Sequence, residues 1–500
     1  MLNDVHELPA GAKLRTPVCV VGSGAAGITT ARALAGHGIE CVLLEAGGLE
    51  LEDDTQALYK GKNVGVPYFA LHHTRLRYFG GSTNHWTGWC RPLDDIDFES
   101  RPWLPYADWP INGQDLAPYA VAAHEILELG PLDYAADSWS QRTKQPLLPL
   151  DPHLATTAIW QFSTPTRFLR RYLDEVADSS QIQAYLYANV VDIEPAPRGR
   201  RVERVRVKAL DGHEIFVYPR VLVLATGAIE NARLLLQSTT GHPRGIGNRH
   251  DVVGRYFIEH PHANVGVITT TLPPEQLALY HDIYRLYEHG PPAAVRGAIA
   301  VPPHVMRRER LLGFSAALEP KVNLPPLGQG LTLGVEQLMR DLQRAGPVRQ
   351  LQLYMRSEQA PNPASRVFLR DERDALGMRR LALDWQLCDR SVASMRRSIE
   401  FAAAAVGKAG VGRVYSFFHA PDRVRGSAWP HFAGGHHHMG TTRMGVDPET
   451  SVVNSDCRLH DVENFYVAGS SVFSTGGFAN PTLTIVKLAL RLVDHLEQRL

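Results

Sequence analysis

The stretch VCVVGSGAAGITTARALAGHGIECVLLEAGG, residues 18–48, constrains the fold of this chain more than any other part of the sequence. A short apolar run ends in glycines, an alanine-rich stretch covers residues 25–36, and a second apolar run ends at Leu44. This order predicts a strand, a glycine turn, a helix and a second strand. Such a βαβ unit implies a parallel sheet, so we predict an α/β fold of Rossmann-like type.

Within this stretch, the spacing Gly22-x-Gly24-x-x-Gly27 predicts a dinucleotide-binding turn. The first glycine allows the tight turn, the second lets backbone approach a diphosphate, and the third lets helix and strand pack closely. Glu45 follows 18 residues later, where its carboxylate can accept both ribose hydroxyls and disfavours a 2′-phosphate. The alternative is an ordinary glycine-rich turn with Glu45 on the surface. The spacing does not separate NAD from FAD.

Length and composition exclude several classes of function. A chain of 500 residues exceeds one hydrophobic core, so two or more domains are expected. Lys+Arg and Asp+Glu both total 52, which predicts no nucleic-acid partner. Five scattered cysteines without a C-x-x-C argue against a disulfide scaffold and fit a reducing cytosol. The first residues lack an apolar signal core, and no apolar run reaches membrane-span length, so we expect a cytoplasmic protein.

Other elements follow from the same periodicities. The predicted elements are strands within 186–208 and 214–224, a strand, glycine turn and helix over 221–236, a helix over 335–343, a hairpin over 365–387 around Gly377, a helix over 390–406, a strand and glycine turn over 464–471, and a helix over 480–496. From about residue 251 the chain becomes proline-rich and loses βαβ spacing. We therefore expect a nucleotide-binding layer from both chain ends, with a different domain between.

Two further stretches carry polar groups that fit either a local structural role or a ligand contact. In RYFGGSTNHWTGWCRP (77–92), Gly80-Gly81 permits close backbone approach, and short donors follow. Taken alone, this is a glycine turn with aromatic packing. Asn480 stands before Pro481, a pair that favours a helix start with Asn480 as the N-cap. The N-terminus of that helix would also stabilise negative charge on a neighbouring ring.

Three consecutive histidines lie in GGHHHMGTTRMG, residues 434–445. In an extended segment His436 and His438 face one way and His437 the other, and no acidic or cysteine partner stands at ligand spacing. We therefore predict no metal site. A polar loop and a proton-transfer site both stay open.

The N-terminal fingerprint, GGSTNHWTG, LATGAIENARLLL, and H-x-x-G-T followed by NPTLT occur in this order, and the chain resembles the glucose–methanol–choline (GMC) oxidoreductases. The likeness is strongest at 17–92, 220–236 and 435–496, nearest to pyranose 2-oxidase-like and FAD-dependent sugar dehydrogenase members. It implies an FAD-binding domain built from both chain ends around an inserted sheet-and-helix substrate-binding domain. The expected domains are 1–250, 251–425 and 426–500.

The resemblance also implies oxidation of an alcohol by hydride transfer to flavin N5. H-x-x-G-T assigns the base to His437, and the partner position falls on Asn480. A neutral imidazole can take the hydroxyl proton near neutral pH, and Asn480 can hold the developing alkoxide.

The expected FAD contacts come from these motifs and neighbouring strand ends. They are Gly22, Gly24, Ala25, Ala26, Gly27, Glu45, Gly80, Gly81, Ser82, Asn84, His85, Trp86, Thr87, Val190, Ala225, Gly227, Gly469, Ser470, Pro481 and Thr482. His85 matches the residue that carries FAD covalently in pyranose 2-oxidase-like members, but Asn84 replaces the usual threonine. Covalent attachment through His85 and simple packing beside the flavin both stay open.

The favoured substrate is a sugar, glycoside or polyol, with oxygen, a quinone or an electron-transfer protein as the electron acceptor. The alternatives are a non-sugar alcohol of a biosynthetic pathway, a flavoprotein lyase on the same fold, and an NAD-linked dehydrogenase. The sequence does not choose the substrate, the carbon oxidised or the acceptor.

Overall fold

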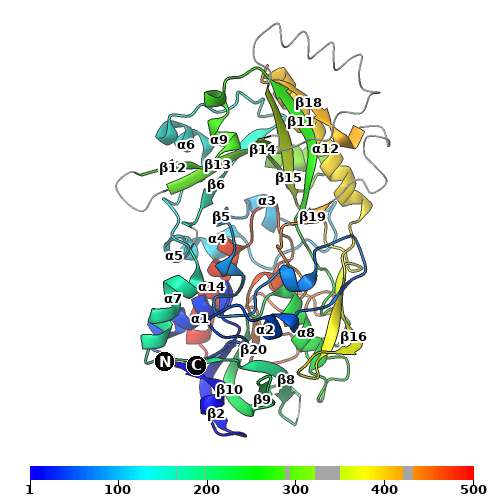
Figure 1. Ribbon diagram of the computed structural model, residues 1–500. Helices are drawn as coiled ribbons and strands as arrows, with labels where there is room; N and C mark the ends of the chain where they lie inside the picture. Colours follow the sequence, from blue (N-terminus) through cyan, green and yellow to red (C-terminus); the bar gives the residue numbers. More distant parts are fainter. Residues whose placement is uncertain (165, 198, 288–292, 321–348, 420–431) are drawn as a thin grey trace.

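The computed structural model describes residues 1–500 except 165, 198, 288–292, 321–348 and 420–431. The helix predicted over 335–343 lies outside the described residues. The described chain has two large sheets, one above the other in Figure 1, with helices packed on both. The mixed α/β fold class predicted from the sequence is confirmed.

The lower sheet in Figure 1 has eight strands drawn from both ends of the chain. In spatial order they are β1 (Leu2–Asp4), β7 (Ile182–Leu186), β3 (Cys41–Leu44), β2 (Lys13–Val21), β10 (Glu214–Leu224), β9 (Val202–Lys208) and β8 (Asn189–Pro195), with β20 (Phe465–Val467) also paired to β10. The pairs along β1-β7-β3-β2-β10 and the β10–β20 pair are parallel. Strands β8 and β9 form an antiparallel extension.

The predicted βαβ unit forms as expected. Helix α1 (Ala25–Gly36) connects β2 to β3, and helix α8 (Ala228–Gln237) follows β10. The last helix, α14 (Thr482–Glu497), packs on α1 and thereby joins the two chain ends. Its N-cap is Pro481 and not Asn480, which corrects the sequence prediction by one residue. The Asn480 side chain is engaged elsewhere, as described below.

The upper sheet has nine antiparallel strands. They are β18 (Arg413–Ser416), β11 (Pro261–Thr270), β15 (Arg349–Ser357), β14 (Phe314–Pro320), β13 (Ala293–Ala300), β6 (Thr156–Phe162) and β5 (Trp89–Cys90), with β12 (Tyr284–Leu286) paired to β13 and β19 (Ala433–Gly434) paired to β11. Strands β5 and β6 precede residue 251 in the sequence, so this sheet draws on both sides of the compositional change.

A third, small sheet contains the predicted hairpin. Strands β16 (Arg366–Arg373) and β17 (Arg379–Asp384) are antiparallel, and β4 (Lys62–Asn63) pairs with β17. The helix predicted over 390–406 is α12 (Asp389–Lys408). The remaining helices are α2 (Asp53–Ala57), α3 (Asp95–Phe98), α4 (Gly113–Leu116), α5 (Ala120–Ile126), α6 (Ala136–Thr143), α7 (Phe168–Asp178), α9 (Ala278–His281) and α10 (Pro303–Glu309).

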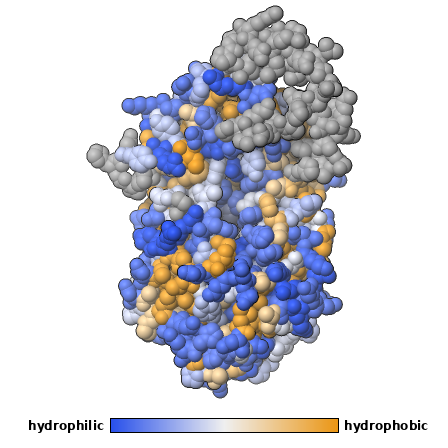
Figure 2. Space-filling model, viewed as in Figure 1, coloured by the Kyte–Doolittle hydropathy of each residue, from blue (hydrophilic) through white to orange (hydrophobic). Residues whose placement is uncertain are grey.

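The surface is mostly hydrophilic on the face seen in Figure 2, with separate apolar patches on its lower half. Among the described residues, no helix has both the length and the apolar character that crossing a bilayer requires.

Candidate active site

A cavity of about 520 Å³ opens at the carboxyl ends of β2, β3 and β10. Val21, Leu44 and Ala225, at or next to these ends, contribute to its wall. Its volume is within the range of roughly 300–1,000 Å³ that small-molecule and cofactor sites occupy. Its position fits the rule that open α/β sheets bind ligands beyond the carboxyl ends of their strands.

Most of the residues expected to contact FAD line this one cavity. They are Gly22, Gly24, Ala25, Ala26, Glu45, Gly81, Ser82, His85, Trp86, Thr87, Val190, Ala225, Gly227, Gly469, Ser470, Pro481 and Thr482. Three others lie behind the wall. A Cβ on Gly27 would come within 1.7 Å of the Gly22 carbonyl oxygen, so Gly27 serves helix–turn packing. Gly80 adopts a left-handed φ of 89°, and the Asn84 amide donates to the Phe79 carbonyl.

The fingerprint end of the cavity fits a nucleotide. The buried Glu45 carboxylate accepts from Ser23 N and Oγ at 3.1 and 2.6 Å and from Gly47 N at 2.9 Å. A carboxylate has about four lone-pair sites, so capacity for a ribose hydroxyl remains. No described atom lies within 4 Å of a Cβ built on Gly24, which leaves open space for a ligand against the backbone.

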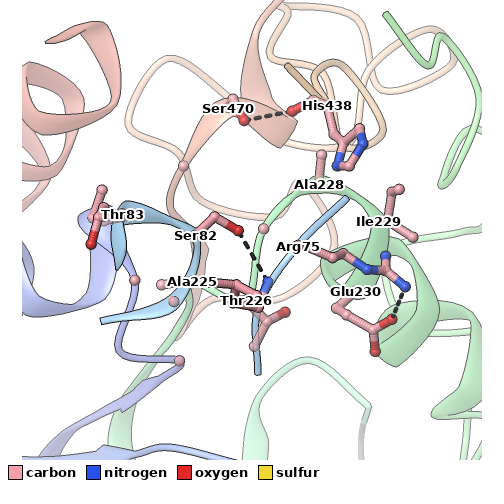
Figure 3. A pocket seen from close by; sticks show the side chains of 18 of the residues that line it. Arg75, Ser82, Thr83, Ala225, Thr226, Ala228, Ile229, Glu230, His438 and Ser470 are labelled. Carbon is pink, nitrogen blue, oxygen red and sulfur yellow. Dashed lines mark hydrogen bonds and ion pairs between the residues drawn. The ribbon is translucent and has the colours of Figure 1, made fainter. Parts of the chain in front are cut away.

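Sequence reasoning missed a buried cation on the cavity wall. Arg75 forms an ion pair with Glu230 at 3.2 Å, and Figure 3 shows the two side chains meeting beside the cavity. Nε and Nη1 of Arg75 are buried without a hydrogen-bond partner. Unpaired buried donors are costly, so an anionic ligand is favoured at this wall. FAD carries a diphosphate, and these donors fit such a cofactor.

At the other end of the cavity, a chain of hydrogen bonds fixes the tautomer of His437. His437 Nδ1 lies 2.8 Å from His260 Nδ1, and His260 Nε2 lies 3.2 Å from the Gly476 carbonyl oxygen. Because a carbonyl oxygen only accepts, His260 Nε2 carries a hydrogen. Burial lowers the pKa of His260 to about 4, so the ring is neutral and its Nδ1 accepts from His437. His437 Nε2 therefore carries a lone pair and no hydrogen.

Asn480 is oriented by a second donor. The indole Nε1–H of Trp160, in β6, donates to Asn480 Oδ1 at 3.2 Å. An indole nitrogen only donates, so this contact identifies the oxygen of the amide. The Asn480 Nδ2 donor then points at His437 Nε2, 3.1 Å away. An imidazole acceptor and an amide donor thus lie side by side on the cavity wall.

A buried carboxylate holds the loop that carries His437. Glu259 accepts from the backbone N–H groups of Gly435, His437 and His260 at 3.1, 2.9 and 2.8 Å, and from the Tyr68 hydroxyl. Burial raises the pKa of Glu259 to about 7, and these hydrogen bonds oppose part of the rise. The Glu259 carboxylate thus fixes the position of the loop at Gly435 and His437 relative to His260.

The three consecutive histidines diverge, but not because the segment is extended. His436 has a left-handed φ of 59°, which corrects the alternation argued from the sequence. Its ring packs on Phe69 with centroids 4.7 Å apart, and His438 Nε2 lies 3.0 Å from the Tyr68 hydroxyl. Only His437 contacts Asn480. The described residues contain no group of three or more His, Cys, Asp or Glu arranged to hold a metal ion.

Burial is the main cause that holds the pKa of His437 well below its ordinary value, and the neighbouring His260, His262 and Arg356 add to it. The ring is therefore a neutral acceptor at physiological pH. The orienting residues Glu259 and His260 lie in the sequence IEHPH, residues 258–262. Two histidines and an acid in an otherwise apolar passage were the available signal, but nothing local linked them to His437.

Comparisons with known proteins agree with this arrangement. Residues 17–256 match the family described as FAD dependent oxidoreductase, and residues 361–489 match the family described as GMC oxidoreductase. The chain is 24% identical to 2-methyl-1,2-propanediol dehydrogenase of Mycolicibacterium austroafricanum, over 97% of this chain and 96% of that protein. It is 25% identical to 6'''-hydroxyparomomycin C oxidase of Streptomyces lividus, over 96% of this chain and 91% of that protein.

Among solved structures, pyridoxine 4-oxidase from Mesorbium loti has a similar fold. The TM-score is 0.57 at 17% identity, with 96% of this chain and 99% of that chain covered. The nucleotide-binding fold, the cavity and both family matches point the same way. The chain belongs to the GMC oxidoreductase family, and it is an FAD-dependent oxidoreductase of the CH–OH group.

Proposed function

We propose that this enzyme oxidises a CH–OH group of a sugar, glycoside or polyol to the carbonyl, with His437 as the base and Asn480 as its partner. One observation carries the proposal: His437 Nε2, which carries a lone pair and no hydrogen, and the Asn480 Nδ2 donor form a hydrogen bond of 3.1 Å on the cavity wall. A substrate hydroxyl that lies beside this pair would replace the hydrogen bond between them, donating to His437 Nε2 and accepting from Asn480 Nδ2.

In the proposed reaction, His437 takes the hydroxyl proton at Nε2 while Nδ1 keeps its own hydrogen, bonded to His260. Asn480 Nδ2 donates to the oxygen, which gains negative charge as the proton leaves. His260 and Trp160 are positioning residues, because they act through His437 and Asn480. FAD, when bound, supplies the acceptor, at its N5 atom, for the hydride that leaves the carbinol carbon.

Residues at three places would hold the cofactor. Glu45 would accept ribose hydroxyls, the open backbone at Gly24 would receive the diphosphate, and Arg75 would contribute positive charge. The negative charge that a flavin gains on reduction would be stabilised by the N-terminus of α14. This part of the proposal is supported by the shared cavity of Glu45, Gly24, His437 and Asn480.

Relatives bear on the substrate class. The relatives named above are a dehydrogenase of a diol and an oxidase of 6'''-hydroxyparomomycin C. A 65-residue stretch, 13% of this chain and 12% of that protein, is 46% identical to a C-glycoside 3-oxidase of Arthrobacter globiformis. They favour polyhydroxylated substrates for this enzyme. The electron acceptor is an oxygen molecule, a quinone or an electron-transfer protein. A cytoplasmic location stays a prediction from the sequence.

Anaerobic flavin bleaching tests the proposal. The FAD-loaded protein is mixed with a panel of aldoses, methyl glycosides and polyols, and flavin absorbance is followed. We expect bleaching by at least one of them, and a loss of about 10²- to 10⁴-fold in its rate in His437→Ala with FAD retained. His436→Ala is the matched control and should bleach normally. Near-normal bleaching in His437→Ala would overturn the assignment, and turnover without any bleaching would indicate a lyase.

A further inference from the structure

The upper sheet presents one face to the proposed catalytic pair, His437 and Asn480. Trp160 bonds Asn480 from this face, and the strand register identifies the side chains that share it. Residues opposite one another in a ladder, and residues two or four apart in one strand, lie on the same face. From strand to strand the members are Trp160, Arg296, Ala300, Ser315, Arg356 and His262. We call this set the inner face.

Arg356 is the unusual member of the inner face. It is 8% exposed, and its Nε atom is buried without a hydrogen-bond partner among the described residues. Glu319, the acid whose charge acts on Arg356, is already paired with Arg296 at 3.0 Å. Burial lowers the pKa of Arg356 to about 10, so the group is still a cation at neutral pH.

The contacts that Arg356 does make leave its donors free. Its guanidinium lies over the Trp89 ring, 3.9 Å from the centroid, and Trp89 itself lines the cavity. Stacking uses the flat face of a guanidinium, whereas its N–H donors point outward in the plane. A cation–π contact offsets only part of the cost of burying a charge without a counter-ion. The Arg356 guanidinium is therefore a buried cation without a counter-ion among the described residues.

His262 links Arg356 to the proposed base. It is the cross-strand partner of Arg356 in the β11–β15 ladder, and its ring centroid is 5.6 Å from that of His437. Its Nε2 atom is buried without a hydrogen-bond partner. Two adjacent residues on the inner face thus have unsatisfied polar atoms, and one of them, His262, packs against the proposed base.

We propose that Arg356 and His262 form a subsite for a carboxylate on the substrate, so that the enzyme oxidises a hydroxy acid or a sugar acid. This inference rests on the proposed function and narrows its substrate class. A carboxylate fits better than a phosphate, because one unpaired guanidinium matches a monoanion and bonds it in bidentate fashion. In the described residues a second unpaired cation is absent from the inner face, since Arg296 has its own acid.

The first test measures anion binding without turnover. The FAD-loaded enzyme is titrated with acetate, and separately with inorganic phosphate, while the flavin spectrum is followed. We expect acetate to bind more tightly than phosphate, and Arg356→Met to weaken acetate binding about 30-fold or more. Arg356→Lys keeps the charge and should lose less, about fivefold. Arg349→Met, on the opposite face of the same strand, is the matched control and should bind acetate within about twofold of wild type.

The second test compares alcohols with and without an acid group. Glucose with glucuronate, and glycerol with glycerate, are matched pairs for anaerobic bleaching. We expect the acid of a pair to be favoured at least about tenfold in kcat/KM, and Arg356→Met to abolish this preference by raising KM for the acid alone. Equal use of both pair members by wild type, or an unchanged preference in Arg356→Met, would overturn the subsite.

The results that would refute the carboxylate subsite differ from those that would refute the proposed function. If no alcohol bleaches the flavin while acetate binding still requires Arg356, the redox proposal fails and the anion subsite stands. If glucose 6-phosphate is favoured over glucuronate, and phosphate binds more tightly than acetate, the carboxylate assignment is wrong. Retained FAD and an unchanged Tm in Arg356→Lys exclude misfolding as the cause of any loss.

Discussion

Replacing His260 by phenylalanine removes one nitrogen acceptor and leaves a ring of similar shape. In the native site His260 Nδ1 accepts from His437 Nδ1 over 2.8 Å, and His260 Nε2 donates to Gly476 over 3.2 Å. The variant leaves the His437 Nδ1–H group buried with no acceptor. That hydrogen can move to Nε2, but the lone pair that takes the substrate proton is then lost.

The size of the effect follows from this hydrogen bond. Leaving a buried donor unsatisfied costs about 1–3 kcal/mol, which corresponds to a factor of roughly 5–150 in the ratio of the two tautomers. We therefore expect the rate of flavin reduction in His260→Phe to fall about 10- to 100-fold. Substrate affinity should change little, because His260 bonds His437 at Nδ1, away from the Nε2 atom that would meet the substrate in the proposed reaction.

Stopped-flow anaerobic reduction separates these quantities. The limiting rate of bleaching reports proton and hydride removal, whereas the substrate concentration at half the limiting rate reports binding. His260→Asn is the control, because an asparagine amide oxygen can stand near the position of imidazole Nδ1 and restore an acceptor. The reasoning is refuted if His260→Phe and His260→Asn reduce flavin at the same rate, or if the loss lies wholly in binding.

Three further predictions concern the same site. The pKa of Glu259 is about 7 in the folded state against an ordinary 4.5, so the folded protein binds more protons at this group than the unfolded chain does. The contribution of Glu259 to the free energy of unfolding is therefore largest below pH 4.5, and it falls by about 3 kcal/mol as the pH rises through 7. Urea unfolding of Glu259→Gln at pH 5 and pH 8 should lack this loss, and a difference from wild type equal at both pH values would contradict it. Acid precipitation should leave flavin in the pellet if His85 carries it and in the supernatant of His85→Ala; flavin wholly in the wild-type supernatant excludes the bond. Gly27→Ala should unfold at a lower temperature because its Cβ would lie 1.7 Å from a carbonyl oxygen, whereas Gly24→Ala should keep its Tm and bind FAD more weakly; equal Tm losses in both would refute this.

Local patterns predicted the elements that local chemistry determines. The βαβ unit, the hairpin around Gly377 and the final helix follow from periodicity and glycine placement, and the structure contains all three. The spacing of the H-x-x-G-T motif also singled out His437 from its neighbours, and in the structure only that ring meets Asn480.

The supporting residues could not be predicted in this way. His260 and His437 are 177 positions apart and meet beside the paired strands β11 and β19, and Trp160 and Asn480 are 320 apart, so both contacts depend on the tertiary structure. A sequence pattern carries no information on such pairs when each residue has a plausible local role. The predictions of an extended conformation at His436 and of an N-cap at Asn480 were wrong by local details. His436 has a left-handed φ, and the N-cap of α14 is Pro481, so the local preferences of these residues did not decide their conformation.

The proposed base and the residues that support it come from distant parts of the chain, so the proposed proton-transfer site forms only when these parts assemble. His437 and Asn480 come from the C-terminal part of the chain, whereas His260 stands at the entry to β11 and Trp160 lies in β6. Grafting the upper sheet of a relative onto this chain would replace His260 and Trp160, which orient the proposed catalytic pair. It would also replace Arg356 and His262, the proposed substrate subsite. Chimeras that swap specificity should therefore keep their rate only when His260 and Trp160 are carried over as well.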